Sequence, residues 1–134
     1  MTQDRPASEK KYTMQEERDV LVAMRDGVRV AADIFRPDDG GRFPALVAMS
    51  PYSKGIQSMP IAIQPDRSAI HHTPTEAGNP AYFTARGYVH IIADVRGTGL
   101  SEGEYLGWMS KQEAEDGYDL IEWAAEQPWC DGNV

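Results

Sequence analysis

The sequence predicts an α/β protein in which a mostly parallel sheet follows an N-terminal antiparallel hairpin. Three features indicate this class: period-two alternation around Asp26-Gly27, two unbroken apolar runs at residues 45–49 and 88–93, and a capped helix pattern after Ser110. Alternation is typical of strands, and unbroken apolar runs suit strands buried on both faces. Strands that alternate with helices usually form parallel sheets with helices on both faces.

The chain is expected to begin with a flexible tail, or at most a strand edge, over residues 1–17, where few apolar residues stand among many charged ones. Residues 18–134 are expected to form the ordered part. Its first element is a hairpin over residues 20–34, because Asp26-Gly27 suits the tight turn between antiparallel strands. A polar, turn-rich stretch over residues 36–41 then leads to the first apolar run.

A long loop over residues 50–79 separates the two apolar runs, and loops of this length are often functional. Asn79 and Pro80 suit the cap and first turn of a short helix that ends near Gly87. The second apolar run is followed by a glycine-rich loop over residues 94–103. This order places one loop after each buried strand.

The last predicted helix begins at a capping box formed by Ser110 and Glu113, and it stops at Pro128. Its apolar face is expected from residues at three- and four-residue spacings. These residues are Ala114, Tyr118, Ile121 and Ala125. Asn133 and Val134 then suit the start of a further strand.

The charge balance argues against a nucleic-acid partner, because 13 Lys and Arg stand against 21 Asp and Glu, for a net charge of −8. No apolar stretch approaches the ~18 residues of a membrane span, and no apolar segment of a secretory signal follows Met1. We therefore expect a cytoplasmic protein without a membrane partner. Cys130 is the single cysteine, which excludes an intrachain disulfide and favours a small buried side chain.

A series of short motifs narrows the class further. The loop Asp94-x-Arg96-Gly97-x-Gly99-x-Ser101 resembles the loop after the fourth strand of many α/β-hydrolases and by itself indicates that superfamily only. The narrower series, in chain order, is Met24-Arg25-Asp26-Gly27-Val28, Ala32-Asp33-Ile34, Pro51-Tyr52, Ser101-Glu102-Gly103, the stretch 113–119, Ile121-Glu122-Trp123, and the stretch 127–134. In this order and spacing they resemble the S15 peptidase family, which contains ester hydrolases of the CocE/NonD kind and X-prolyl dipeptidyl-peptidases. The resemblance extends from about Val20 to Val134.

The resemblance implies the N-terminal part of an α/β-hydrolase fold and a serine hydrolase that cleaves esters or amides through an acyl-enzyme, without a cofactor or metal. In that family, the tyrosine that matches Tyr52 donates its hydroxyl to the oxyanion. The serine, aspartate and histidine of the triad would follow Val134, so the chain is expected to be truncated before the nucleophile elbow and inactive alone. The implied partners are a small ester, amide or short peptide and the downstream remainder of the hydrolase.

Two alternatives remain open. The chain could be a non-catalytic truncated product that acts only by association with other protein. The residues encoded after Val134 would distinguish such a product from part of a hydrolase. A different α/β-hydrolase chemistry, in which an aspartate replaces the nucleophilic serine, is disfavoured by the hairpin and by the motif at residues 115–119.

Several other side chains are candidates for chemistry. Ser101 lies in a Gly-x-Ser-x-Gly pattern, but no helix follows it directly, so it is expected to organise the loop rather than act as nucleophile. Asp94 and Arg96 are expected to form a structural ion pair or loop hydrogen bonds. Trp108 could reach the pocket, although packing is expected first for tryptophans.

The three histidines are weaker candidates for a functional role than Tyr52. His71 and His72 are adjacent and lack a nearby cysteine or carboxylate cluster, which argues against a metal site. His90 lies within the second apolar run and is expected to be a core residue. The sequence therefore points to Tyr52 as the residue that takes part in the chemistry.

Overall fold

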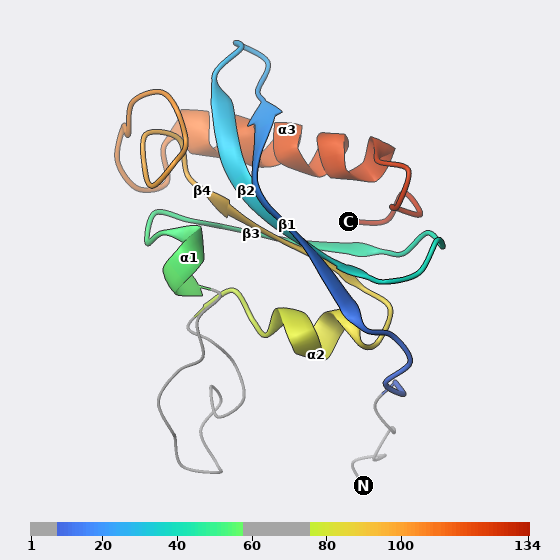
Figure 1. The fold of residues 1–134 in the computed structure, drawn as a ribbon. Helices are drawn as coiled ribbons and strands as arrows, with labels where there is room; N and C mark the ends of the chain where they lie inside the picture. The colour runs from blue at the N-terminus through green and yellow to red at the C-terminus, as the bar shows by residue number, and fades with distance from the viewer. Residues whose placement is uncertain (1–7, 58–75) are drawn as a thin grey trace, which may run out of the picture.

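The computed structural model describes residues 8–57 and 76–134, which form one four-stranded sheet and three helices. The strand order is β1-β2-β4-β3. Figure 1 shows α3 on one face of this sheet, with α1 and α2 on the other. In chain order the elements are β1 (Met14–Ala23), β2 (Arg29–Pro37), β3 (Ala45–Ser50), α1 (Lys54–Gln57), α2 (Pro80–Thr84), β4 (Val89–Asp94) and α3 (Lys111–Glu126).

The predicted hairpin is confirmed: β1 and β2 pair antiparallel, and the turn between them contains Asp26 and Gly27. Gly27 has a φ of +86°, a left-handed conformation that glycine adopts without steric cost. In β1, the register shifts between Glu17 and Val20, and Asp19 lies there at a φ of +56°. The strand therefore contains a bulge in its middle.

Within residues 8–17, the structure shows the expected alternative of an edge strand rather than a flexible tail, because β1 is an outer strand of the sheet. Strand β1 begins at Met14, which pairs with Pro37 of β2. Before it, the backbone N–H of Lys11 donates to the carbonyl of Ala85 at 2.7 Å. The ring of Tyr12 packs edge-on against Phe43 at 5.1 Å, so apolar contacts outweigh the polar composition of this segment.

The expected mostly parallel sheet is also wrong for the described strands. β3 and β4 are parallel, whereas β2 pairs antiparallel with both β1 and β4. The reason is that the hairpin joins the sheet directly and supplies two of its four strands. Helices do cover both faces, as predicted.

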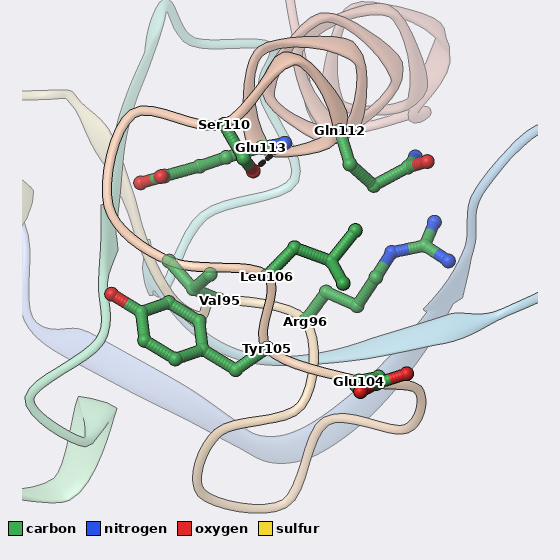
Figure 2. Close-up of a pocket in the computed structure, with 8 residues that line it drawn as sticks. All are labelled: Val95, Arg96, Glu104, Tyr105, Leu106, Ser110, Gln112 and Glu113. Atoms are coloured by element: carbon green, nitrogen blue, oxygen red, sulfur yellow. Dashed lines mark hydrogen bonds between the residues drawn. The ribbon is translucent and has the colours of Figure 1, made fainter.

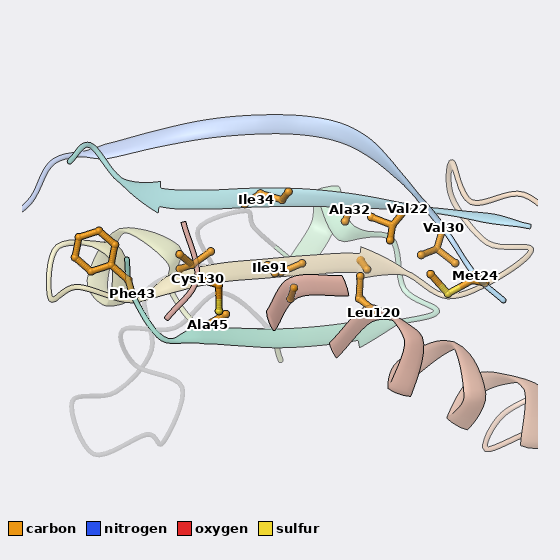
Figure 3. Close-up of a cluster of buried hydrophobic side chains, with 13 residues drawn as sticks. Val22, Met24, Val30, Ala32, Ile34, Phe43, Ala45, Ile91, Leu120 and Cys130 are labelled. Atoms are coloured by element: carbon orange, nitrogen blue, oxygen red, sulfur yellow. The ribbon is translucent and has the colours of Figure 1, made fainter. Parts of the chain in front are cut away.

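The core lies between the sheet and α3 (Figure 3). Every residue of β4 is buried, which confirms the prediction for the second apolar run. In β3 only Ala45 and Ser50 are buried, because β3 is the outer strand at one side of the four-stranded sheet. The core cluster consists of Val22, Met24, Val30, Ala32, Ile34, Phe43, Ala45, Val89, Ile91, Ala93, Leu120, Ala124 and Cys130.

The two predicted helix starts are confirmed. The side chain of Asn79 accepts hydrogen bonds from two N–H groups in the first turn of α2, and Pro80 is the first residue of that helix. The Ser110 hydroxyl accepts from the N–H of Glu113 at 3.1 Å. Helix α3 ends at Glu126, two residues before Pro128.

The apolar face predicted for α3 is wrong. Tyr118 is 60% exposed and Ile121 is 41% exposed, whereas the buried residues are Asp116, Leu120 and Ala124. Asp116 faces inward because it pairs with Arg96 of the loop after β4. The buried face therefore combines this ion pair with Leu120 and Ala124, which pack in the core.

The segment after α3 returns to the sheet beside the start of β3. Phe43 and Cys130 form a parallel bridge, and the N–H of Ala45 donates to the carbonyl of Asn133 at 2.9 Å. Cys130 is fully buried, as predicted. The segment thus lies along the outer side of β3, parallel to it.

Candidate active site

Two loops leave the sheet side by side. Because β3 and β4 are parallel and Ser50 pairs with Asp94, the Pro51-Tyr52 turn and the glycine-rich loop start at adjacent strand ends. Ligands of open α/β sheets bind outside the carboxyl ends of the strands. A functional site is therefore expected at this edge of the sheet.

Tyr52 lies on the first of these loops, with its side chain directed largely to solvent. The residue is 51% exposed. Its ring meets the ring of Trp108 edge-on, at 6.4 Å between centroids. Trp108, which follows the glycine-rich loop, is itself 68% exposed, so the two aromatic rings form an open surface between the loops.

The turn that carries Tyr52 is fixed at both ends. On one side, the N–H of Tyr52 donates to the hydroxyl of buried Ser50 at 3.1 Å. On the other, the N–H of Lys54 donates to a carboxylate oxygen of Asp94 at 2.6 Å. Between them Ser53 has a φ of +58°, a conformation that costs free energy in a residue with a Cβ.

Asp94 connects the two loops. Its carboxylate is 1% exposed and accepts from Lys54 of the first loop and, at 3.0 Å, from the N–H of Leu100 in the second. A Cβ at Gly99 would lie 2.2 Å from a carboxylate oxygen of Asp94, so glycine is required there. The predicted role of Asp94 in loop hydrogen bonds is confirmed, and both of these donors are backbone N–H groups.

Ser101 organises the loop, as predicted. Its hydroxyl donates to the carbonyl of Asp94 at 2.7 Å and accepts from the N–H of Ala31 at 2.8 Å. The one histidine in the described part of the chain is His90, eleven residues before Ser101 in β4, and its ring packs on Phe83 at 5.5 Å. Both hydrogen-bonding functions of the Ser101 hydroxyl are therefore directed at backbone groups.

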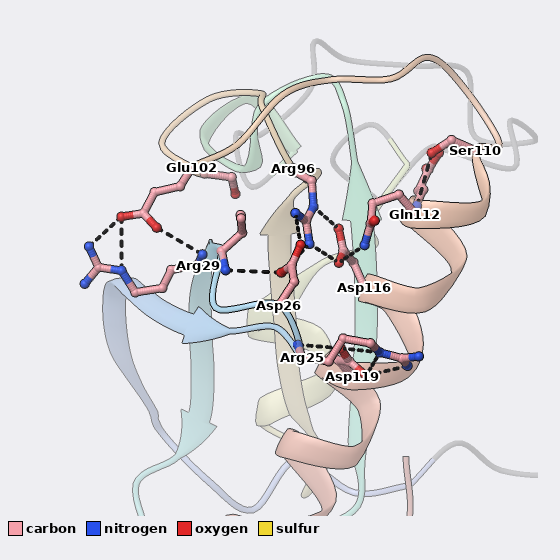
Figure 4. A network of polar contacts seen from close by, with 12 residues as sticks. Arg25, Asp26, Arg29, Arg96, Glu102, Ser110, Gln112, Asp116 and Asp119 are labelled. Carbon is pink, nitrogen blue, oxygen red and sulfur yellow. Dashed lines mark hydrogen bonds and ion pairs between the residues drawn. The ribbon is translucent and has the colours of Figure 1, made fainter.

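Arg96 joins three parts of the fold (Figure 4). Its guanidinium donates to both carboxylate oxygens of Asp116 in α3, at 2.7 and 2.8 Å, and to both of Asp26 in the hairpin turn, at 2.6 and 3.0 Å. The hydrogen bonds to Asp116 and Asp26 raise the pKa of Arg96, and the same contact lowers the pKa of Asp26. The predicted ion pair between Asp94 and Arg96 is therefore wrong, because Arg96 pairs with Asp116 and Asp26 instead.

A second charged cluster lies under the Tyr52 turn. The ammonium of Lys54 contacts Asp33 at 2.9 Å and also contacts Asp19 at the β1 bulge. Burial by itself lowers the pKa of Lys54, but the hydrogen bonds to these two carboxylates outweigh it and the net shift is upward. The Asp33 carboxylate also accepts from Arg18 at 2.8 Å.

Sequence reasoning missed Lys54 and the role of Asp33. Burial alone raises the pKa of Asp33, but hydrogen bonds from the backbone of Asp19 and from Lys54 and Arg18 lower it overall. The available signal was the position of Asp33 between apolar residues 30–32 and 34–35 of β2, where a buried carboxylate requires a partner. Its partner, 21 residues away, left no sequence pattern.

His90 is a core residue, as predicted. It is 2% exposed, and burial lowers its pKa, with a partial offset from a backbone hydrogen bond to Ala77. His71 and His72 lie outside the described residues. Among residues 8–57 and 76–134, no group of three His, Cys, Asp or Glu could hold a metal ion. The helices of the described part are also too short or too polar to cross a membrane.

A small pocket lies between the glycine-rich loop and the start of α3 (Figure 2). It is lined by Val95, Arg96, Glu104, Tyr105, Leu106, Ser110, Gln112 and Glu113. Its cavity volume of about 10 Å³ lies far below the ~300 Å³ at which ligand pockets usually begin. The open surface at Tyr52 and Trp108 is the better candidate for a substrate contact.

Comparison with known proteins decides the family. Residues 26–134 match the model of the X-Pro dipeptidyl-peptidase (S15) family. The chain belongs to the S15 peptidase family. This S15 chain is also 37% identical, over 115 residues, to the cocaine esterase of Rhodococcus sp. strain MB1 Bresler. That match covers 86% of this chain and 17% of the esterase.

Solved structures agree with this assignment. A CocE/NonD family hydrolase from Staphylococcus aureus has a TM-score of 0.76 and 39% identity, covering 90% of the S15 chain and 22% of the hydrolase. The match to an α-amino acid ester hydrolase has a TM-score of 0.64 and 24% identity, and it covers 98% of this chain and 23% of the hydrolase. At this identity the match is evidence for the fold and not for the activity. The chain thus spans about a fifth of the length of these relatives and has the fold of the N-terminal part of an α/β-hydrolase.

Proposed function

We propose that this chain contributes to a serine hydrolase that cleaves ester or amide bonds through an acyl-enzyme, and that Tyr52 is one donor of its oxyanion hole. The observation that carries the proposal is the position of Tyr52. Its exposed side chain stands at the carboxyl end of β3, on a turn anchored at both ends. Membership of a family that includes an esterase supports the reaction class.

The chemistry requires a donor at this edge of the sheet. When a serine attacks an ester or amide carbonyl, the carbonyl oxygen gains negative charge, and hydrogen bonds aimed at that oxygen stabilise the transition state. A tyrosine hydroxyl suits this role because it donates without carrying a charge. In the proposal, the nucleophilic serine, the aspartate and the histidine come from residues after Val134, and no cofactor is needed.

The proposed substrates are small esters, amides or short peptides. The relatives named above include a cocaine esterase and a family of X-Pro dipeptidyl-peptidases. The exposed rings of Tyr52 and Trp108 would offer an apolar surface beside the reacting carbonyl. The cytoplasmic location expected from the sequence remains a prediction.

The first experiment is to read the gene beyond the codon for Val134. A frame that continues into a strand and a Gly-x-Ser-x-Gly elbow supports the proposal. A stop codon would instead support the alternative of a non-catalytic product that acts through association with other protein. The 134-residue chain alone is expected not to hydrolyse p-nitrophenyl acetate above a protein blank.

The second experiment is Tyr52→Phe in the complete hydrolase. Removal of one oxyanion donor typically lowers kcat by about 10² to 10³. KM should change much less, because the hydrogen bond acts mainly in the transition state. Tyr82→Phe is the matched control, since Tyr82 is also exposed but lies on α2. A parental kcat for Tyr52→Phe, with acylation rate-limiting, would refute the proposed role.

A further inference from the structure

Lys54 is buried close to the proposed oxyanion donor. Its side chain is 7% exposed, although lysine is almost never buried unless it is paired. Two carboxylates pair with it, Asp33 from the middle of β2 and Asp19 from the bulge of β1. A buried charge pair contributes little net stability compared with apolar residues of the same volume, so its presence here calls for another role.

Lys54 attaches the Tyr52 turn to three strands. Its backbone N–H binds Asp94 at the end of β4, and its ammonium binds β2 and β1 on the same face of the sheet. Tyr52 lies only two residues earlier, across the strained Ser53. With half of its surface exposed, Tyr52 depends for its position on the two ends of the turn.

We propose that Lys54 is a positioning residue, whose ion pairs with Asp33 and Asp19 hold the Tyr52 hydroxyl at the point where the oxyanion forms. This inference rests on the proposed function of Tyr52. An oxyanion donor acts at about 2.7–3.1 Å from the charged oxygen. A misplacement of ~1 Å typically lowers the rate about 10²-fold, so a support that fixes the turn has a direct effect on kcat.

The test is a double-mutant cycle in the complete hydrolase, with kcat and KM measured for each protein. Lys54→Met keeps most of the buried stem and removes the charge. We expect it to lower kcat at least tenfold while KM changes less than about threefold. In a Tyr52→Phe background, the same substitution should change kcat by less than about threefold, because the donor that Lys54 positions is already absent.

Lys111→Met is the matched control, because it makes the same substitution at a lysine whose side chain is 90% exposed. Its kcat should stay within about twofold of the parent. If Lys54→Met does not fold, Lys54→Met combined with Asp33→Asn removes both charges and is measured in the same cycle. Near-ultraviolet circular dichroism verifies that each variant is folded.

The outcomes separate the two proposals. If Tyr52→Phe lowers kcat but Lys54→Met lowers it equally in both backgrounds, or leaves it at the parental value, the positioning role is wrong and the oxyanion role stands. If Tyr52→Phe itself has parental kcat, the oxyanion role is wrong and the positioning role falls with it. Loss of the Lys54→Met effect in the Tyr52→Phe background supports both.

Discussion

Replacement of Gly99 by alanine should release the clamp that Asp94 forms between the two loops. Gly99 has a φ of +51°, and a Cβ there would lie 2.2 Å from one carboxylate oxygen of Asp94 and 2.4 Å from its carboxylate carbon. Two heavy atoms that are not bonded to each other cannot stay this close. The carboxylate must move away, and it then loses the N–H groups of Lys54 and Leu100.

The magnitude follows from two contributions. A residue with a Cβ in the left-handed region costs roughly 1–2 kcal/mol. Loss of two hydrogen bonds to a buried charge adds about 1.5–3 kcal/mol for each bond. Gly107→Ala is the control, because Gly107 has a φ of +97° and nothing within 4 Å of a Cβ. Gly99→Ala should therefore destabilise the protein by ~3–6 kcal/mol more than Gly107→Ala.

Hydrogen exchange provides the direct assay. The amides of Lys54 and Leu100 should lose protection in Gly99→Ala and retain it in Gly107→Ala, since exchange reports local opening. Thermal unfolding of the two variants in the complete protein then compares their stabilities. Equal midpoints and unchanged protection of both amides would show that Asp94 does not hold the loops together.

Three further predictions concern the charged groups and the loop hydroxyl. Arg96→Met leaves Asp116 buried without a cation and should cost about 3–5 kcal/mol in the free energy of unfolding. Arg25→Met, at an exposed arginine, should cost far less, and equal losses in urea unfolding would contradict this. The pKa of Asp33 in the folded protein lies below its ordinary value of 3.8. The ionised carboxylate therefore stabilises the fold fully above pH 3.8, and this contribution is lost as the pH falls through the lower folded-state pKa. Thermal midpoints should drop below about pH 4, and they should drop less in Asp33→Asn. Ser101→Ala removes one loop hydroxyl at a cost of ~1 kcal/mol and should keep kcat within an order of magnitude; loss of all turnover would identify Ser101 as the nucleophile.

The hairpin, the second buried strand and both helix caps could be predicted because each depends on neighbouring residues. Asp26-Gly27 makes a turn from local conformational preference, and Ser110 caps α3 through a contact three residues away. The same reasoning located Tyr52 at a strand end beside a second loop, since parallel strands finish at one edge of the sheet.

The features that could not be predicted depend on residues far apart in the chain. The predicted apolar face of α3 was wrong: the buried face includes the charged residue Asp116, whose partner Arg96 lies 20 residues earlier and leaves no local pattern. The cluster beneath the Tyr52 turn joins Lys54 to Asp33 across 21 residues, and nothing in the local sequence marks that contact. The antiparallel pairing of β2 with β4 is likewise a long-range choice.

The contacts of Arg96 also constrain the order in which the chain folds. Its guanidinium binds Asp26, 70 residues earlier, and Asp116, 20 residues later. These contacts cannot all form until the hairpin, β4 and α3 are present. The hairpin pairs residues close in sequence and can form early, whereas β4 must then find β2 across a long intervening segment. The Arg96 cluster therefore requires α3, and it cannot form on a nascent chain that ends before Asp116.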